Sequence, residues 1–143
     1  MSDPSLDGGC LCGAVRFHVT AAPSAVLYCH CRMCQRAAGA PVVAWFTVPV
    51  AGLRWLNGEP RVHRSSDGAV RLSCPACGSQ LAFQADSVPD RLDLTVASLD
   101  RPAGLVPTYH CWTASQLPWF DTDDTLPRYR QAHASQPAKD EEA

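Results

Sequence analysis

The spacing of the cysteines most constrains what this chain can fold into. Seven of the eight cysteines fall into three clusters at metal-ligand spacing, which are Cys10 and Cys12, then Cys29, Cys31 and Cys34, and finally Cys74 and Cys77. The central three lie within six residues, too close together for a relaxed set of disulfides, and packing does not explain them. All three can reach one soft cation, so the pattern favours metal binding.

The composition is typical of one folded domain in a reducing compartment. The chain has 143 residues, of which 46% are hydrophobic and 18% are charged, enough to bury a core. Its net charge of −2 gives no general attraction to nucleic acid or to anionic membranes. The N-terminal residues lack the basic and apolar regions of a secretory signal, and no apolar run has the length of a membrane span. We therefore expect a cytoplasmic protein, in which clustered cysteines more often bind metal than form disulfides.

Short apolar segments separated by Gly and Pro predict a mostly-β domain. Alternating residues predict half-buried strands over 14–20 and 91–97, and β-branched and aromatic residues predict a well-buried strand over 42–48. Further short strands are expected over 53–56, 60–64, 70–72 and 108–113, and a short apolar run over 25–28 leads into the central cysteines. The Asn57-Gly58 pair is a strong hairpin signal between two of them.

Three other local expectations complete this outline. Residues 32–38 can form one or two turns of helix, closed by Gly39 and stopped by Pro41. Trp119 and Phe120 are expected in the core. A single domain is expected over residues 1–134, followed by a disordered tail over 135–143, which is small and charged.

The run Cys74-Pro75-Ala76-Cys77-Gly78 predicts half of a structural zinc site. A two-residue spacer turns the chain so that both sulfurs face one ion, and Gly78 can take the positive φ of such a turn. Cys10 and Cys12 can supply the other half. The resulting closed four-thiolate site would attach the N-terminal strand to residues 70–80 and contribute on the order of 10 kcal/mol to folding.

The central cluster then forms a second zinc site with three thiolates and an open fourth position, as in catalytic zinc sites. Cys111, His30 or His110 can alternatively close this site, and a free Cys111 can also be a small apolar core residue. Three thiolates leave a zinc centre at about −1, a weak activator of water, so zinc-hydroxide hydrolysis is disfavoured. The site suits a soft fourth ligand instead, namely a substrate thiol.

The motifs as a set resemble the glutathione-dependent formaldehyde-activating enzyme family, whose domain also occurs in centromere protein V. The matching segments are Gly9-Cys10-Leu11-Cys12-Gly13-Ala14-Val15, Cys29-His30-Cys31-Arg32-Met33-Cys34-Gln35-Arg36, Gly39-Ala40-Pro41, Cys74-Pro75-Ala76-Cys77-Gly78, Val96-Ala97-Ser98-Leu99-Asp100, His110-Cys111-Trp112 and Pro118-Trp119. They cover roughly residues 7–130 in family order. Cys111 stands where the family usually has an aliphatic residue.

This resemblance implies a β-tent of short antiparallel strands with two zinc ions. It places a structural zinc at Cys10, Cys12, Cys74 and Cys77 and a catalytic zinc at Cys29, Cys31 and Cys34. The implied activity is that of a carbon–sulfur lyase, the reversible condensation of glutathione with formaldehyde to S-(hydroxymethyl)glutathione.

The expected partners are a glutathione-like thiol and a small electrophile, without nucleic acid or membrane, and an oligomer is compatible with the sequence. Arg32 and Arg36 flank the central cluster and can bind a glutathione carboxylate, or can simply face solvent on a short helix. Two alternatives to a lyase remain, a non-catalytic zinc-stabilised protein-binding module and a metal-buffering or redox protein.

Overall fold

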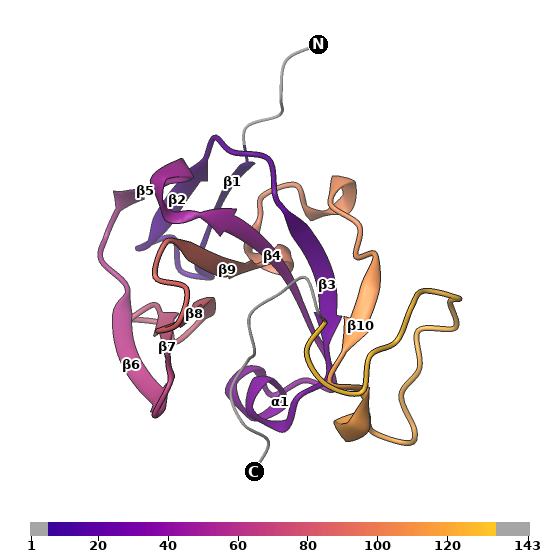
Figure 1. Cartoon of the computed structure of the whole chain (residues 1–143). Coiled ribbons are helices and arrows are strands. Elements are labelled where there is room, and N and C mark those ends of the chain that lie inside the picture. The colour runs from indigo at the N-terminus through magenta and orange to yellow at the C-terminus, as the bar shows by residue number, and fades with distance from the viewer. Residues whose placement is uncertain (1–5, 134–143) are drawn as a thin grey trace.

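The computed structural model describes residues 6–133, which form two β-sheets and one short α-helix (Figure 1). The smaller sheet has the strand order β1-β2-β5, and the larger has the order β10-β3-β4-β9-β8-β7-β6. The strands are β1 (Leu6–Gly9), β2 (Arg16–Val19), β3 (Ala25–Cys29), β4 (Val43–Pro49), β5 (Leu53–Asn57), β6 (Arg61–Ser66), β7 (Ala69–Ser73), β8 (Gln80–Ala85), β9 (Arg91–Thr95) and β10 (Tyr109–Cys111). Paired strands are antiparallel, except that β10 lies parallel to β3. The prediction of a mostly-β, antiparallel fold is confirmed.

Short helices connect several of these strands. They are α1 (Arg32–Ala38) and the 3-10 helices η1 (Val50–Gly52), η2 (Val96–Ser98), η3 (Pro102–Gly104) and η4 (Thr113–Ser115). None of the helices within residues 6–133 is long and apolar enough to cross a membrane. The tail predicted over 135–143 lies outside the described residues, and the boundaries of a single domain over 1–134 stay a prediction.

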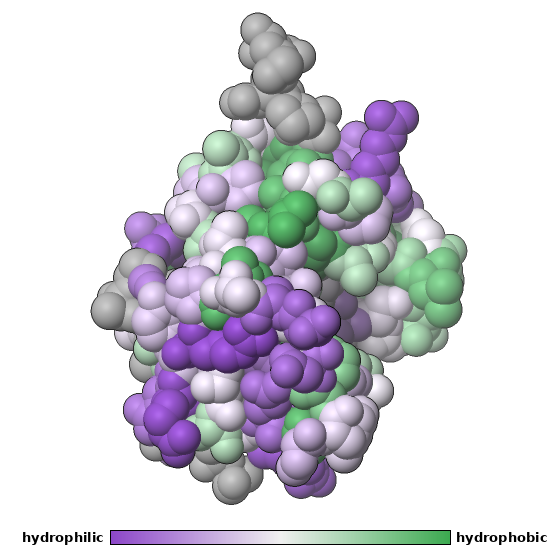
Figure 2. Space-filling model, turned by 90° about the vertical axis from the view of Figure 1, so that its right-hand side faces the viewer, coloured by the Kyte–Doolittle hydropathy of each residue, from purple (hydrophilic) through white to green (hydrophobic). Residues whose placement is uncertain are grey.

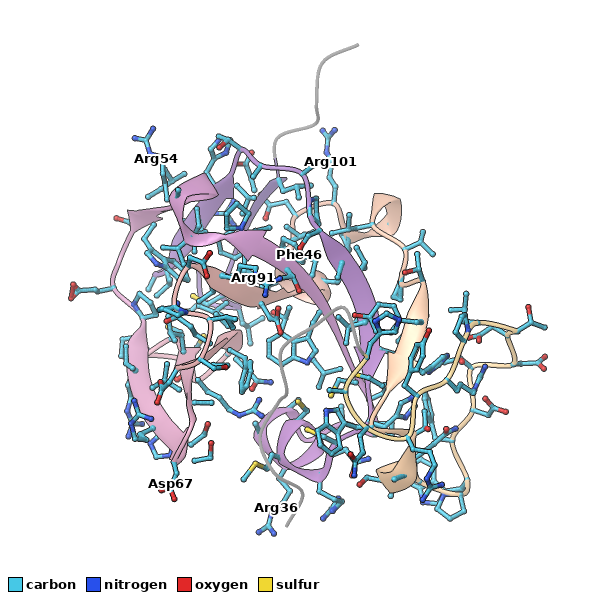
Figure 3. All side chains as sticks on the ribbon, viewed as in Figure 1. Arg36, Phe46, Arg54, Asp67, Arg91 and Arg101 are labelled. Carbon is cyan, nitrogen blue, oxygen red and sulfur yellow. The ribbon has the colours of Figure 1, made fainter. Side chains whose placement is uncertain are left out.

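Strand β4 is buried on both faces, as its composition predicted. Successive side chains of a strand point to opposite faces of the sheet. Phe46, near the centre of Figure 3, therefore packs in a hydrophobic cluster with Phe17 of β2, while Trp45 packs in a second cluster. The first cluster joins the two sheets, and the second contains the central cysteines.

Helix α1 begins and ends where the sequence predicted. The sulfur of Cys31 caps its N-terminus by accepting a hydrogen bond from the backbone N–H of Cys34 at 3.2 Å. Gly39 ends it in the left-handed conformation, with φ at 64°, and its N–H donates to the carbonyl of Gln35 at 2.8 Å. This N-terminal cap brings the sulfur of Cys34, in the first turn, next to the sulfur of Cys31.

The hairpin predicted at Asn57-Gly58 is wrong. Strand β5 pairs with β2 in the smaller sheet, whereas β6 pairs with β7 in the larger one. Gly58 has φ at 70°, and a Cβ on it would lie 2.2 Å from the carbonyl oxygen of Ala14. The glycine therefore lets the chain pass close to the β1–β2 turn as it crosses between sheets. Gly58 does take the positive φ that such a pair favours, but this local preference does not determine which strand pairs next.

Two further expectations are only partly met. The strand predicted over 91–97 ends at Thr95, where η2 begins, although Leu92, Leu94 and Val96 are all buried. Trp119 is not in the core, because 74% of its surface is exposed. It lies in a turn in which the N–H of Phe120 donates to the carbonyl of Leu117 at 3.1 Å, and such a turn projects its central side chains toward solvent.

Substituting Gly58 by Ala should destabilise the fold by more than about 2 kcal/mol, since a Cβ there requires both a left-handed backbone and an overlap with the chain at Ala14. Gly68→Ala is the matched control, because no heavy atom lies within 4 Å of a Cβ at that turn position. Urea unfolding of both variants measures the difference. Equal free energies of unfolding would contradict this account of the crossing.

Candidate metal centres

Four cysteines meet where two strand connections approach each other. Cys10 and Cys12 lie between β1 and β2, and Cys74 and Cys77 lie between β7 and β8. All four sulfurs lie within 4.8 Å of one another, with Cys10 and Cys12 separated by 3.7 Å and Cys12 and Cys74 by 3.8 Å. A tetrahedral ion with Zn–S distances of about 2.3 Å separates its sulfurs by about 3.8 Å. The group therefore fits zinc, and the structure brings together the four residues that the sequence assigned to one site.

Backbone N–H groups around this four-thiol group stabilise sulfur in its ionised form. The N–H of Val15 donates to Cys10 at 3.2 Å, and the N–H of Cys77 donates to Cys74 at 3.4 Å. Burial raises the pKa of Cys10, but the N–H of Val15 and the contact with Cys74 outweigh it and lower that pKa. The hydroxyl and backbone N–H of Ser79 lower the pKa of Cys77 to about 5. These contacts favour the thiolate form at Cys10 and Cys77. At Cys12 the backbone N–H of Ala14 lowers the pKa, but the neighbouring thiols, first that of Cys10, outweigh it and raise the pKa to about 11.

The central three cysteines come together at one end of α1. Cys29 ends β3, Cys31 caps the helix, and Cys34 faces inward from the first turn. Their sulfurs lie within 4.8 Å of one another, and none of the three residues has exposed surface. We refer to these residues as the three-thiol group. Soft donors converging at this separation fit a metal ion of the zinc type.

In the three-thiol group the surroundings favour the neutral thiol, unlike the surroundings of Cys10 and Cys77. Burial, together with the neighbouring thiols, raises the pKa of Cys29 well above its usual value. The Cys29 thiol lowers the pKa of Cys31, but Cys34 and burial outweigh it and raise that pKa to about 12. Three thiolates are therefore stable in this interior only when cations accompany them.

One such cation is a residue that sequence reasoning missed. Arg71 of β7 is 6% exposed, and its Nη2 donates to the sulfur of Cys34 at 3.6 Å. Its Nη1 donates to Oε1 of Gln80 at 3.0 Å, and its guanidinium carbon lies 4.9 Å from the centre of the Phe83 ring. The positive charge of this arginine offsets the negative charge that three thiolates would leave on a divalent ion. No local motif marks it, because an arginine in a short strand reads as a surface residue.

The three residues considered as a fourth ligand, Cys111, His30 and His110, lie outside the three-thiol group as the structure describes it. Cys111 is buried beside Cys29 on the paired strand and interacts with its thiol, but within residues 6–133 it is not part of the group whose sulfurs all lie within 4.8 Å. His30 and His110 are not part of that group either. Nε2 of His30 instead lies 2.8 Å from Nδ1 of His110.

The two histidines belong to a buried polar chain that reaches the surface. Nε2 of His110 lies 3.2 Å from both carboxylate oxygens of Asp124, which also accepts a hydrogen bond from the hydroxyl of Thr122. Because a carboxylate only accepts, His110 donates to Asp124 and its Nδ1 accepts from His30. Burial, followed by the neighbouring His110, lowers the pKa of His30 to about 4. The chain of contacts therefore holds a neutral His30 between two cysteines of the three-thiol group.

The segment that carries Asp124 covers one side of the molecule. Figure 2 views this side, on which β10 and the residues after it lie, and a broad hydrophilic band crosses its lower half. Asp121, Asp123 and Arg130 are exposed along this segment. The hydrogen bond from His110 to Asp124 therefore connects a solvated surface loop to the interior.

The helix residues next to the central cysteines have unequal positions. Gln35 is buried, and its Nε2 donates to the carbonyls of His30, Pro41 and Ser115. Arg32 donates to Oε1 of Gln35 at 2.6 Å, so it is engaged within the helix. Arg36 is exposed and points outward from α1 at the lower edge of Figure 3. A ligand-binding role for these two arginines stays a prediction.

A comparison with protein-family models identifies one family. The sequence model of the family described as glutathione-dependent formaldehyde-activating enzyme matches residues 5–115. That segment contains all seven clustered cysteines. Among solved structures, the crystal structure of a Rhodobacter sphaeroides protein is similar, with a TM-score of 0.57 and 26% sequence identity, and the match covers 71% of this chain and 97% of that one. No curated protein matches the chain.

Replacing Arg71 by Met should lower the zinc affinity of the three-thiol group by roughly 10- to 100-fold, the range found when partners of metal ligands are removed. Metal content after dialysis against graded chelator measures this effect, and the four-thiol group should keep its ion. Arg54→Met is the control, since Arg54 is exposed on β5 at the opposite end of Figure 3 from Arg36. Equal retention of two ions in both variants would exclude the charge-balancing role.

The hydrogen bonds that the Asp124 carboxylate accepts should make stability depend on pH. The hydrogen bond from Thr122, followed by the backbone N–H of Leu126 and His110, lowers the pKa of Asp124. Its contribution is thus fully present above its unfolded pKa of about 3.9 and is lost as the pH falls through the folded value. In acid unfolding, Asp124→Asn should differ from the natural protein at pH 6 and approach it at pH 2, both pH values lying well to either side of about 3.9.

The control for this measurement is Asp123→Asn, because the exposed Asp123 carboxylate makes no hydrogen bond or ion pair in the described part of the chain. A constant difference between Asp124→Asn and the natural protein across the whole pH range would show that the carboxylate charge is not what holds this loop.

Proposed function

The chain belongs to the glutathione-dependent formaldehyde-activating enzyme family, and from this premise we propose that it is a zinc-dependent carbon–sulfur lyase. Its substrate would be a thiol adduct of a small carbonyl compound, such as S-(hydroxymethyl)glutathione formed from glutathione and formaldehyde. In this proposal Cys10, Cys12, Cys74 and Cys77 hold a structural zinc ion, and Cys29, Cys31 and Cys34 hold a catalytic one.

The observation that carries the proposal is the unequal size of the two sulfur groups. Zinc in proteins prefers four ligands, and a structural site supplies all four from the chain. Within residues 6–133, the four-thiol group offers four sulfurs to one ion, whereas the three-thiol group offers three. A three-ligand site leaves one place for a substrate atom, and sulfur is the atom that suits a thiolate-rich ion.

The side chains around the three-thiol group favour thiol chemistry over hydrolysis. A bound zinc ion would supply the charge that keeps a substrate thiol ionised and nucleophilic near neutral pH. Arg71 adds a positive charge beside Cys34, and so helps to hold an anionic sulfur in a buried place. Gln35 holds three backbone segments together around the cluster, because its side chain donates to carbonyls within the cluster, after α1 and in η4.

The proposed reaction is balanced without a further reactant. In the forward direction the thiol sulfur forms a bond to the carbonyl carbon, the carbon–oxygen π bond opens, and the proton of the thiol ends on the new hydroxyl. In the reverse direction the carbon–sulfur bond breaks and the hydroxyl proton returns to sulfur. The chain's contribution is to bind the thiol, to orient it and to limit water around it.

One observation favours the alternative, a non-catalytic zinc-stabilised module. All three residues of the three-thiol group are fully buried, as in a purely structural site. A structural ion would be tightly held and would not respond to added thiol. The two functions therefore differ in a property that can be measured directly.

Cobalt-substituted protein tests the proposal. Adding glutathione should change the visible and thiolate charge-transfer absorption of one of two bound cobalt ions, because an incoming sulfur completes its coordination. The same protein with zinc should accelerate the exchange between formaldehyde and S-(hydroxymethyl)glutathione, measured by NMR exchange spectroscopy, over the spontaneous rate.

Two cysteine variants control this experiment. Cys34→Ala should lose one metal ion, the spectral response and the acceleration together, whereas Cys111→Ala, a buried cysteine outside both groups, should retain all three. Two tightly bound ions with no spectral or kinetic response to glutathione would reject the lyase in favour of the structural module.

A further inference from the structure

A pocket of about 280 Å³ lies between α1 and strands β6 to β8, on the side of the helix that faces these strands. Its lining includes Ala37 of α1, Arg61 and His63 of β6, Arg71 of β7 and Gln80 of β8. Within residues 6–133, none of the residues that line it is acidic. The described part of the chain therefore presents nitrogen donors to this pocket without a carboxylate.

The strand register brings these donors to one face. Residues two apart on a strand point to the same side, so Arg61 and His63 share a face of β6. His63 lies opposite Arg71 in the antiparallel pairing of β6 with β7. Two nitrogen donors opposite each other, such as His63 and Arg71, do not stabilise the strand pair by their mutual contact. An anion between them would turn this arrangement into a favourable one.

Gln80 adds a donor at the inner edge of the pocket. Its Oε1 accepts from Arg71, which fixes the orientation of the amide. Its Nε2 is buried and has no hydrogen-bond partner among residues 6–133. An unpaired buried donor is destabilising unless an acceptor reaches it. A ligand oxygen in the pocket is one such acceptor.

An apolar pocket continues from the same edge. It measures about 360 Å³, shares Ala37, Gly78 and Gln80 with the first, and extends along Val42, Val43 and Ala44. A molecule with a charged end and a less polar body can therefore lie across the two pockets. Such a shape is that of a small peptide-like thiol rather than of an inorganic anion.

Arg71 connects this surface to the sulfurs. The residues of the three-thiol group have no exposed surface, so a thiol must reach them past residues that border solvent. Arg71 lines the pocket and also contacts the sulfur of Cys34 at 3.6 Å. Arg71 is therefore a residue that borders both the pocket and the three-thiol group.

We propose that this pocket binds a carboxylate of the thiol substrate, with Arg61 and His63 as the binding residues at its mouth and Gln80 as a donor at its inner edge. The assignment rests on the proposed thiol chemistry at the three-thiol group. It gives the protein a preference for carboxylate-bearing thiols over neutral ones, because charge-assisted hydrogen bonds to a carboxylate are stronger than neutral contacts.

Arg61→Gln tests this assignment with three probes on the zinc-loaded protein, namely glutathione, S-methylglutathione and 2-mercaptoethanol. S-methylglutathione keeps both carboxylates but has no free thiol, and 2-mercaptoethanol has the thiol without a carboxylate. Calorimetric titration should show a Kd raised roughly tenfold for the first two probes, as expected for loss of one charge-assisted contact, and unchanged for the third. His63→Ala should act in the same direction.

The matched control is Arg54→Gln, an equal change of charge on an exposed strand of the other sheet. Equal affinities of Arg61→Gln and Arg54→Gln for glutathione, or an equal loss for all three probes, would overturn the pocket assignment. A catalysed exchange rate that is the same in Arg61→Gln and in the natural protein would reject the carboxylate-binding role of the pocket and leave the lyase proposal standing. Binding of S-methylglutathione that depends on Arg61, without catalysed exchange, would reject the lyase and support the pocket.

Discussion

The electrostatics of buried sulfur is the constraint on which the rest of this structure depends. Three thiols with no exposed surface lie within 4.8 Å of one another. In a medium of low polarity they cannot all ionise unless positive charge is placed among them. A divalent ion would supply most of that charge, and Arg71 places a further positive charge beside Cys34 from a strand distant in sequence. The fold around the cluster is arranged to bring these groups together and to keep water out.

The two cysteine groups differ in their depth in the fold and in the groups that surround their sulfurs. The four-thiol group lies in two strand connections, where the backbone N–H of Val15 and the side chain of Ser79 favour the thiolate form of Cys10 and Cys77. With a bound ion it would link the smaller sheet to the larger one, which share no paired strand within residues 6–133. The three-thiol group lies deeper and depends on buried side chains, chiefly Gln35, Arg71 and the pair of His30 with His110. A linking function suits the first group, and a binding function suits the second.

Local signals predicted local structure well and long-range pairing poorly. The cap at Cys31 and the stop at Gly39 set the ends of α1, because both act on backbone groups within one turn. The turn at Gly58 was also recognisable, but the hydrogen bonds that follow it are made with β7 rather than with β5, and no property of the turn residues selects between those partners. Trp119 was assigned to the core from its hydrophobicity alone, whereas its place in a turn leaves it in solvent.

The sequence by itself determined which cysteines can share an ion, since metal-ligand spacing is a property of short chain segments and four sulfurs make a complete zinc shell. It also determined the mostly-β class and the family. Only the tertiary structure decided that the three-thiol group is fully buried, that Arg71 reaches Cys34, and that His30 turns toward His110 rather than toward the metal ligands. Each of these contacts joins residues more than thirty-five positions apart. The free energies of these contacts depend on burial and on the charges nearby. Both are set only when the sheets pack, so a short sequence pattern does not reveal them.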